Sequence, residues 1–475
     1  MPRFRPTPRL QWPFLLLALA ACPDGKAPQQ PGTGTGTGGS KQLKRQLSSL
    51  PYVNWVPVKK KDRGLSGVTR HNPDRAYRGL NLYCSLPRAR ARLVDMFGRQ
   101  VHSWASQAGQ PSPPELEWRR TWSHLDFIGW QHVKMTRSGE LFVVVYLYGL
   151  LKLDWDSRVL WVAPFGAHHD IDVADNGEIY TLAAEKRQVR HQGRKLRILD
   201  DLVLILGPDG KQRRRISMLK VLRADPRTAP LLKKKLDWAA PHFANNFAAQ
   251  ALLAQALIKD KRRLQLTAAA YQQILTDRFA GTKRIERMLM ISMLPMDPLH
   301  VNSLEILRRD VEGLGRKGDL LLSVRELDLV LVMDPRQAKI RWTFGPDVLQ
   351  RQHQPSLLDS NRLLIFDNGT FARRSRVVEL DPASSKIVWS YQAKDFFSPI
   401  RGGCQRLPNG NTLIVESERG RALEVAPDGA LVWEFFNPDT KDPFMGRERA
   451  PIYRMTRLAP EFLARPTSAP TRLNR

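Results

Sequence analysis

Short apolar runs, separated by polar turns that contain Asn or Gly, recur along most of the chain. Each repeat consists of an apolar run, an Asn/Gly turn, two further apolar runs joined as a hairpin, and a short final run that usually ends in Trp. Turn residues between short alternating runs are typical of β-hairpins. Six units follow this pattern, and they cover residues 79–104, 132–161, 169–216, 300–342, 353–389 and 404–433.

Four strands per unit, repeated at intervals of roughly forty residues, are characteristic of β-propeller blades. Hydrophobic residues make up 42% of the chain, which is sufficient for a large core. We therefore predict an all-β fold, a six-bladed β-propeller, over residues 51–475.

One segment departs from this pattern. Residues 219–281, between the third and fourth units, are rich in Ala, Leu, Gln and Lys at helical spacing and contain few β-branched residues. This composition favours helices, so we predict a helical insertion between the third and fourth blades. Its basic residues are most simply interpreted as a solvated face, with contact to a membrane surface as the alternative.

Histidines stand at the start of four units. His169 and His353 each lie eight residues before the turn that precedes the second strand of their unit, His132 lies seven residues before it, and His300 begins the fourth unit. The first strand of a propeller blade lines the central channel, so we expect all four side chains to point toward the axis. A single histidine there is more often structural, but four in phase indicate a binding site.

Two other polar residues share a position at the far end of the second strand. Arg325 and Asn368 each lie seven residues after the turn of their unit. A cationic funnel lined by histidines and a guanidinium group suits the binding of an oxyanion. His168, the neighbour of His169, lacks the spacing shared with His353 and is the weaker candidate.

Charge bears on the class of partner. The chain has 75 Lys and Arg against 46 Asp and Glu, a formal net charge of +29. This excess suits an anionic partner such as nucleic acid, anionic lipid or a sulfated or phosphorylated small molecule. Arg is abundant along the whole chain, so a general compositional bias is the alternative interpretation.

The N-terminus favours an exported protein. Arg3, Arg5 and Arg9 precede the apolar run PFLLLALAAC, which is too short for a mature membrane span, and we interpret residues 1–21 as a secretory signal peptide. The sequence LAAC, which ends at Cys22, resembles a bacterial lipobox, in which Cys22 is lipidated and becomes the first mature residue. Cleavage at another site is the alternative.

The segment after Cys22 has the composition of a tether. Residues 22–50 are rich in Pro, Gly, Thr and Ser, which predicts a flexible chain without a core. We expect a protein on the periplasmic side of the bacterial cell envelope that contacts a membrane through its N-terminal lipid. An exported protein has little opportunity to meet nucleic acid, so we expect no nucleic-acid partner.

Only two further cysteines, Cys84 and Cys404, remain, and there is no CxxC motif. This excludes a cysteine-rich metal site and a disulfide framework. The two residues belong to the first and sixth units, which are neighbours in a closed ring, and an oxidising compartment permits a disulfide. Their different strand positions argue against a bridge, so two buried free thiols are the simpler expectation, with the disulfide as the alternative.

The motifs around the histidines resemble those of a known family. They are HHDI (168–171), HVNSL (300–304), SVRE (323–326), QHQPSLLDSNRLLIFDNG (352–369) and LPNGNTLIVES (407–417). In this order they are similar to the bacterial arylsulfate sulfotransferases, which are periplasmic six-bladed propellers. The resemblance extends over nearly the whole mature chain, but the helical insertion and the lipobox depart from the best-known members.

The resemblance implies a sulfotransferase that is independent of the nucleotide donor PAPS. It would move a sulfuryl group from an aryl sulfate to a phenol through a sulfohistidine intermediate, in a ping-pong reaction. It implies His353 as the nucleophile, with His169, His300 and Arg325 as catalytic residues and Asn302 as a substrate-binding residue. From their register, we expect Asn368 and His132 to bind substrate as well.

The chemistry agrees with these residue types. Sulfuryl transfer resembles phosphoryl transfer, in which positioning and charge stabilisation dominate, and a neutral imidazole is a competent nucleophile. We expect no cofactor and no metal. A non-catalytic envelope propeller that acts as a scaffold or binding module is the alternative, and a quinone-dependent dehydrogenase lacks a convincing calcium-ligand set. The donor, the acceptor, the choice of membrane and the formation of a homodimer stay open.

Overall fold

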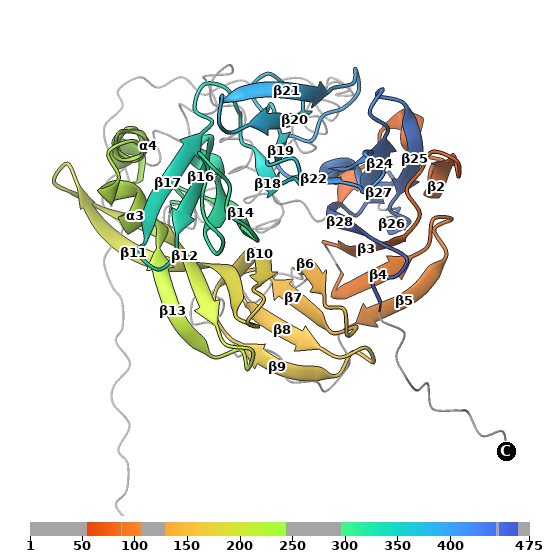
Figure 1. The fold of residues 1–475 in the computed structure, drawn as a ribbon, viewed down its shortest axis with the longest axis horizontal. Helices are drawn as coiled ribbons and strands as arrows, with labels where there is room; N and C mark the ends of the chain where they lie inside the picture. Colours follow the sequence, from red (N-terminus) through yellow and green to blue (C-terminus); the bar gives the residue numbers. More distant parts are fainter. Residues whose placement is uncertain (1–54, 87, 106–128, 244–295, 443–445, 464–475) are drawn as a thin grey trace, which may run out of the picture. The chain divides into compact units, whose positions relative to one another are not determined.

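The computed structural model describes residues 55–86, 88–105, 129–243, 296–442 and 446–463 (Figure 1). All described residues belong to one compact unit. The predicted signal peptide, Cys22 and the predicted tether therefore lie outside the described residues. Among the described helices, none is both long and apolar enough to cross a membrane.

Six antiparallel sheets, which we call blades 1 to 6, form most of the described structure. Blade 1 contains β28 (Ile452–Leu458), β3 (Leu80–Ser85), β4 (Arg90–Val94) and β5 (Gln100–Ala105). Blade 2 contains β6 (Trp130–Met135), β7 (Leu141–Val145), β8 (Gly149–Leu153) and β9 (Val159–Ala163). Blade 3 contains β10 (Ala167–Val173), β11 (Ile179–His191), β12 (Arg194–Leu206) and β13 (Gln212–Ser217).

The remaining blades follow the insertion. Blade 4 contains β14 (Val301–Ile306), β15 (Leu320–Val324), β16 (Leu329–Asp334) and β17 (Lys339–Phe344). Blade 5 contains β18 (His353–Leu357), β19 (Leu363–Asp367), β20 (Arg376–Asp381) and β21 (Lys386–Tyr391). Blade 6 contains β22 (Gly403–Arg406), β23 (Thr412–Glu416), β24 (Arg421–Val425), β25 (Leu431–Phe436) and β2 (Gly67–His71). A small sheet joins β1 (Val56–Pro57), β27 (Glu448–Arg449) and β26 (Thr440–Lys441), and the 3-10 turns are η1 (Lys60–Asp62), η2 (Arg325–Leu327) and η3 (Ser417–Arg419).

The blades form a closed ring. Their innermost strands contact one another in the order β28, β6, β10, β14, β18 and β22, and β22 contacts β28. The predicted six-bladed β-propeller is therefore confirmed (Figure 1).

The ring closes by an exchange of strands that the repeat pattern does not reveal. β28, near the C-terminus, supplies the innermost strand of blade 1, and β2 adds an outer strand to blade 6. Arg457 of β28 strengthens the closure, because its Nη1 lies 2.9 Å from Glu424 Oε2 of blade 6 and its Nε donates to Asn81 Oδ1 of blade 1 at 2.5 Å. Both Arg457 and Glu424 are fully buried, so loss of either would leave an uncompensated charge in the core.

The two cysteines do not form a bridge. Cys84 and Cys404 are free and buried, and Cys84 Sγ donates to the carbonyl oxygen of Gln131 at 3.3 Å. Packing, strand pairing and buried ion pairs therefore close the ring without a disulfide between these residues.

The predicted helical insertion is present between blades 3 and 4. Helices α3 (Met218–Ala224) and α4 (Ala229–Phe243) follow β13 directly, and residues 244–281 of the predicted insertion lie outside the described residues. The Ser217 side chain caps α3 by accepting a hydrogen bond from Lys220 N at 3.2 Å. Leu232 and Leu236 of α4, one turn apart, pack into the core beside the long β11–β12 hairpin.

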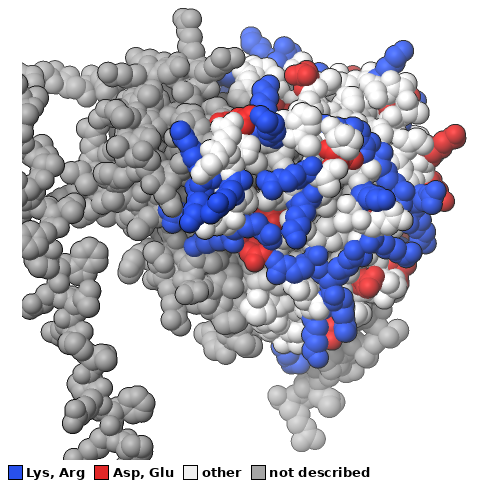
Figure 2. Space-filling view, turned by 90° about the vertical axis from the view of Figure 1, so that its left-hand side faces the viewer, with Lys and Arg blue, Asp and Glu red and all other residues white. Residues whose placement is uncertain are grey.

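Basic residues cover the outer face of this region. Figure 2 shows Lys and Arg side chains spread over the side of the propeller on which blade 3 and helices α3 and α4 lie. Exposed members include Arg190, Lys195, Arg214, Lys220 and Lys234. The solvated-face interpretation therefore accounts for most basic residues of the described part of the insertion, and the partly buried Lys235 is an exception.

Candidate active site

The innermost strands of five blades carry a β-bulge at the N-terminal end. The register shifts lie between Ile452 and Met455, Trp130 and His132, His168 and Ile171, Val301 and Ser303, and His353 and Ser356. Bulges re-aim side chains and are frequent beside active sites. All four predicted channel histidines lie at or next to these bulges, and all four are buried.

The histidines do not share one ladder position, contrary to the expectation from their spacing. His353 is the last paired residue before its bulge, and the residue at that position in β10 is His168. His169 lies within the bulge, with φ at 61°, whereas His300 precedes β14 with φ at 51°. His132 follows its bulge. The bulges differ in length between blades, so counting back from the turn misaligns the strands.

Three of the four histidines nevertheless come together at the axis. The ring centroids of His169 and His300 are 4.7 Å apart. His353 is 1% exposed, and it is close enough to His169 to affect the pKa of that residue. His132 stands to one side, with its Nε2 at 3.5 Å from Asp170 Oδ1.

Two acceptors fix the imidazole of His353. Its Nδ1 lies 2.7 Å from Asn368 Oδ1 and 3.0 Å from the carbonyl oxygen of Arg351. Because both partners can only accept, the proton resides on Nδ1 and the lone pair on Nε2. No described residue forms a hydrogen bond to Nε2. The structure thus presents an imidazole of defined tautomer, with its Nε2 lone pair not used by the described residues.

Asn368 is itself held in a single orientation. Its Nδ2 donates to the carbonyl oxygens of Ser398 at 2.7 Å and Arg401 at 2.9 Å, and this leaves Oδ1 for His353. We predicted Asn368 as a substrate-binding residue. Both of its side-chain polar atoms form hydrogen bonds within the protein, one of them to His353, and its role toward a substrate stays a prediction.

Carboxylates stand behind the two other central histidines. Nδ1 of His300 lies 2.5 Å from Asp297 Oδ2. Nδ1 of His169 lies 2.7 Å from Nδ1 of His168, and Nε2 of His168 lies 3.0 Å from Asp201 Oδ1. His168, the weaker candidate from the sequence, thus lies between His169 and a buried carboxylate, although its Nε2 is within ion-pair distance of Asp201 without hydrogen-bond geometry. Such carboxylate–histidine pairs fix ring orientation and stabilise an imidazolium.

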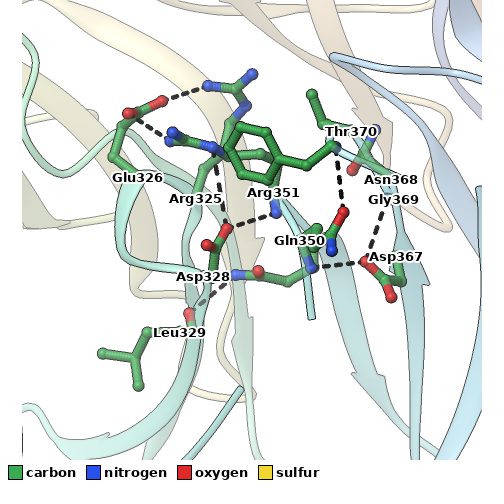
Figure 3. A network of polar contacts seen from close by, with 12 residues as sticks. Arg325, Glu326, Asp328, Leu329, Gln350, Arg351, Asp367, Asn368, Gly369 and Thr370 are labelled. Carbon is green, nitrogen blue, oxygen red and sulfur yellow. Dashed lines mark hydrogen bonds and ion pairs between the residues drawn. The ribbon is translucent and has the colours of Figure 1, made fainter. Parts of the chain in front are cut away.

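Arg325 stands at the start of η2, next to this cluster. Its Nη1 donates to Glu326 Oε1 at 2.5 Å, and Arg351 also bonds to the Glu326 carboxylate. Figure 3 shows both guanidinium groups directed at Glu326, with Asp328 beside Arg351. Nε of Arg325 is buried and has no hydrogen-bond partner among the described residues. The described residues therefore leave at least one N–H of this guanidinium without an acceptor.

Two further residues, the predicted Asn302 and its neighbour at the axis, Tyr453, complete the centre. Asn302 is fully buried, its Nδ2 donates to the carbonyl oxygen of Gln352 at 2.9 Å, and its Oδ1 lacks a hydrogen-bond partner among the described residues. The ring of Tyr453 lies 5.9 Å from that of His169 and 6.2 Å from that of His132, measured between centroids. The Tyr453 hydroxyl also has no partner in the described structure.

Sequence reasoning missed Arg454. This β28 residue is buried, its Nη1 lies 2.7 Å from Asp170 Oδ1, and its Nη2 donates to the carbonyl oxygen of Asn302 at 3.1 Å. It joins blades 1, 3 and 4 at the axis. The alternating sequence IYRMTRL could have suggested a strand, but only the ring closure places that strand innermost.

Burial and positive charge set the protonation of the centre. Burial lowers the pKa of His353 well below its ordinary value, and the charge of Arg325 lowers it further, against the opposing effect of the Asn368 hydrogen bond. Burial also lowers the pKa of His169 well below its ordinary value, with His300 as the next contribution. Both imidazoles are therefore neutral at neutral pH.

Comparisons with known proteins bear on this site. Residues 270–438 match the arylsulfotransferase (ASST) family model, and no curated protein matches the chain. The matched segment contains His300, Arg325, His353 and Asn368, whereas His132 and His169 precede it.

The solved structures that resemble this chain share little sequence with it. A protein of unknown function from Bacteroides caccae is 12% identical, with a TM-score of 0.44, 80% of this chain covered and 98% of that chain. A streptogramin B lyase is 8% identical, with a TM-score of 0.40 and coverage of 85% and 97%. The Dos1 propeller is 9% identical, with a TM-score of 0.37 and coverage of 79% and 76%. The fold assignment rests on the strand order and the closed ring of blades, and the family model identifies the chain as one that carries an arylsulfotransferase (ASST) family domain over residues 270–438.

Proposed function

We propose that this protein is an arylsulfate sulfotransferase, which transfers a sulfuryl group from an aryl sulfate to a phenol through a sulfohistidine at His353. The observation that carries the proposal is the hydrogen bonding of His353. Asn368 Oδ1 and the Arg351 carbonyl hold Nδ1, so Nε2 is left as the nucleophile beside Arg325.

In the first half-reaction, the Nε2 lone pair of His353 attacks the sulfur of the donor. The bond between sulfur and the aryl oxygen breaks, and the phenolate leaves with the electron pair. The unsatisfied edge of Arg325 would contact the sulfuryl oxygens, where each well-placed donor contributes about 3–4 kcal/mol if oxyanion-hole losses are a guide. Asn302 and His132 would bind substrate beside it.

His300 and His169 would carry out the proton transfers. His300, whose ring Asp297 orients through Nδ1, is placed to protonate the departing phenolate. In the second half-reaction, the acceptor phenol gives its proton to neutral His169 or to His300 and its oxygen attacks the sulfur. The bond between sulfur and Nε2 breaks, and His353 regains its lone pair.

The direct test is incubation of the purified protein with 4-nitrophenyl sulfate, with and without phenol. We expect release of nitrophenolate that phenol accelerates, together with formation of phenyl sulfate. Absence of both products would contradict the proposed function. We also propose that the protein acts at the periplasmic side of the cell envelope, lipid-anchored through Cys22, and labelling with a fatty-acid analogue in wild-type and Cys22→Ser cells tests that anchor.

A conservative change of Arg325 should be costly. Lysine keeps the positive charge but cannot offer the planar pair of donors that matches two sulfuryl oxygens. We therefore expect Arg325→Lys to lower kcat/KM for 4-nitrophenyl sulfate by at least about tenfold, which is about 1.4 kcal/mol of barrier. An unchanged value would show that Arg325 acts only through its ion pair with Glu326.

The pH dependence of the first half-reaction should reveal the buried nucleophile. Because the pKa of His353 lies well below its ordinary value, its neutral form persists as the pH falls. We expect the single-turnover rate with donor alone to change by less than about twofold between pH 7.5 and 6.0. A histidine with the reference pKa of about 6.5 would lose about three quarters of its neutral form over that range, with a matching loss of rate.

A further inference from the structure

The carboxylate of Glu326 connects the helical insertion to Arg325, the residue that we propose binds the sulfuryl group. Helix α4 lies against η2, the turn that carries Arg325 and Glu326. Nζ of Lys235 on α4 is 2.5 Å from Glu326 Oε2, the oxygen that also bonds to Arg351. Glu326 Oε1 accepts from Arg325 Nη1. The Glu326 carboxylate thus contacts three cationic side chains, and one of them, Lys235, lies on the insertion.

The sharing of Glu326 determines how much of Arg325 remains available. A carboxylate that faces a guanidinium alone prefers the bidentate arrangement, with two parallel N–H···O bonds. Here Lys235 and Arg351 occupy Oε2, so Glu326 holds Arg325 through Nη1 only. Nε of Arg325 consequently stays without a hydrogen-bond partner in the described structure.

The electrostatics agree with this geometry. Burial alone would raise the pKa of Glu326, but Arg351, Lys235 and Arg325 together hold it well below its ordinary value. The carboxylate is therefore ionised and able to compete with a substrate anion for Arg325. Lys235 is placed to weaken that competition, because its ammonium group binds the same carboxylate.

We propose that Lys235 is a positioning residue of the sulfotransferase site: by occupying Glu326 Oε2, it keeps one edge of Arg325 open for the sulfuryl group. This inference rests on the proposed function. It gives the helical insertion a role at the donor site, and it makes Glu326 a competitor of the substrate that Lys235 restrains.

The first test compares two neighbouring lysines of α4. Lys235→Met should lower kcat/KM for 4-nitrophenyl sulfate by about tenfold, the lower end of the range for residues that orient a functional group. Lys234→Met removes the same charge from an exposed position and should leave kcat/KM within about twofold of wild type. Lys235→Arg, which keeps a cation at Oε2, should retain most of the activity. Equal values for Lys235→Met and Lys234→Met would overturn the inference.

The second test distinguishes positioning from simple loss of structure. Without the Glu326 carboxylate, nothing competes for Arg325, so Lys235→Met/Glu326→Gln should be more active than Lys235→Met alone. A merely structural role for Lys235 predicts an additive or greater loss in the double variant, and that result would overturn the inference. Thermal midpoints of all variants check folding, and Lys235→Arg remains informative if Lys235→Met does not fold.

The wild-type assay separates this inference from the proposed function. If the wild-type protein releases no nitrophenolate, the proposed function fails and the inference fails with it. If wild type is active and the two lysine variants behave alike, only the role of Lys235 is contradicted.

Discussion

Replacement of His353 by alanine is expected to reduce sulfuryl transfer by at least about a thousandfold, as removal of a covalent nucleophile does in other group-transfer enzymes. Among the central histidines, His353 has its Nδ1 held by an amide oxygen and a backbone carbonyl rather than by a carboxylate or another imidazole. His169 and His300 face the same centre, but each is paired with another histidine or a carboxylate. Steady-state assays with 4-nitrophenyl sulfate and phenol measure the loss.

The fold should survive this change. His353 lies at a strand end and its polar partners are an amide and a backbone carbonyl, so truncation removes little apolar packing. Circular dichroism should be unchanged and the thermal midpoint should fall only moderately. His102→Ala, which removes a histidine of blade 1 that stacks on Trp155, is the matched control and should keep activity within about twofold. Full turnover by His353→Ala would contradict the assignment of the nucleophile.

Replacement of Asn368 by alanine is expected to lower activity by about a hundredfold, although the residue has no free side-chain atom for substrate. Without Oδ1 at 2.7 Å, the proton of His353 can move to Nε2 and block the nucleophilic lone pair. Loss of a group that fixes a catalytic tautomer is costly even when geometry is retained. The loss should appear in kcat for every donor rather than in KM.

Asn176→Ala serves as the control for this variant. Asn176 is an exposed turn residue whose side chain contacts Glu178, so its loss should leave kcat unchanged. A rise in KM with unchanged kcat for Asn368→Ala would instead restore the substrate-binding role that its spacing suggested. The thermal midpoint shows how much of the effect comes from the two buried carbonyls that lose their donor.

The blade pattern could be predicted because strand alternation and turn residues are local signals. The closure of the ring could not, because β28 pairs with β3 from the opposite end of the chain and no repeat unit contains both. Arg454 could not be predicted for the same reason. It lies on β28, and its contacts are to Asp170 and Asn302 on two other blades.

The sequence indicated residues that approach one another at the axis, but not their detailed geometry. The rings of His169 and His300 lie together, with His353 and Arg325 near them, and the roles of these residues stay predictions. Bulge lengths differ between blades, so neither the register nor the relay through His168 to Asp201 follows from spacing. The role of Lys235 could not be predicted at all, because its interpretation as a solvated residue is correct for most of its basic neighbours.

The central claim is that the sulfuryl group resides covalently on His353 between the two half-reactions. Incubation of the wild-type protein with 4-nitrophenyl sulfate alone, followed by quenching at alkaline pH and peptide mapping by mass spectrometry, tests it most directly. We predict one sulfuryl group on the peptide that contains His353, at the imidazole, and its loss when phenol is added before the quench. An unmodified His353 peptide from a protein that turns over donor and acceptor, or a sulfuryl group on another residue, would contradict the mechanism.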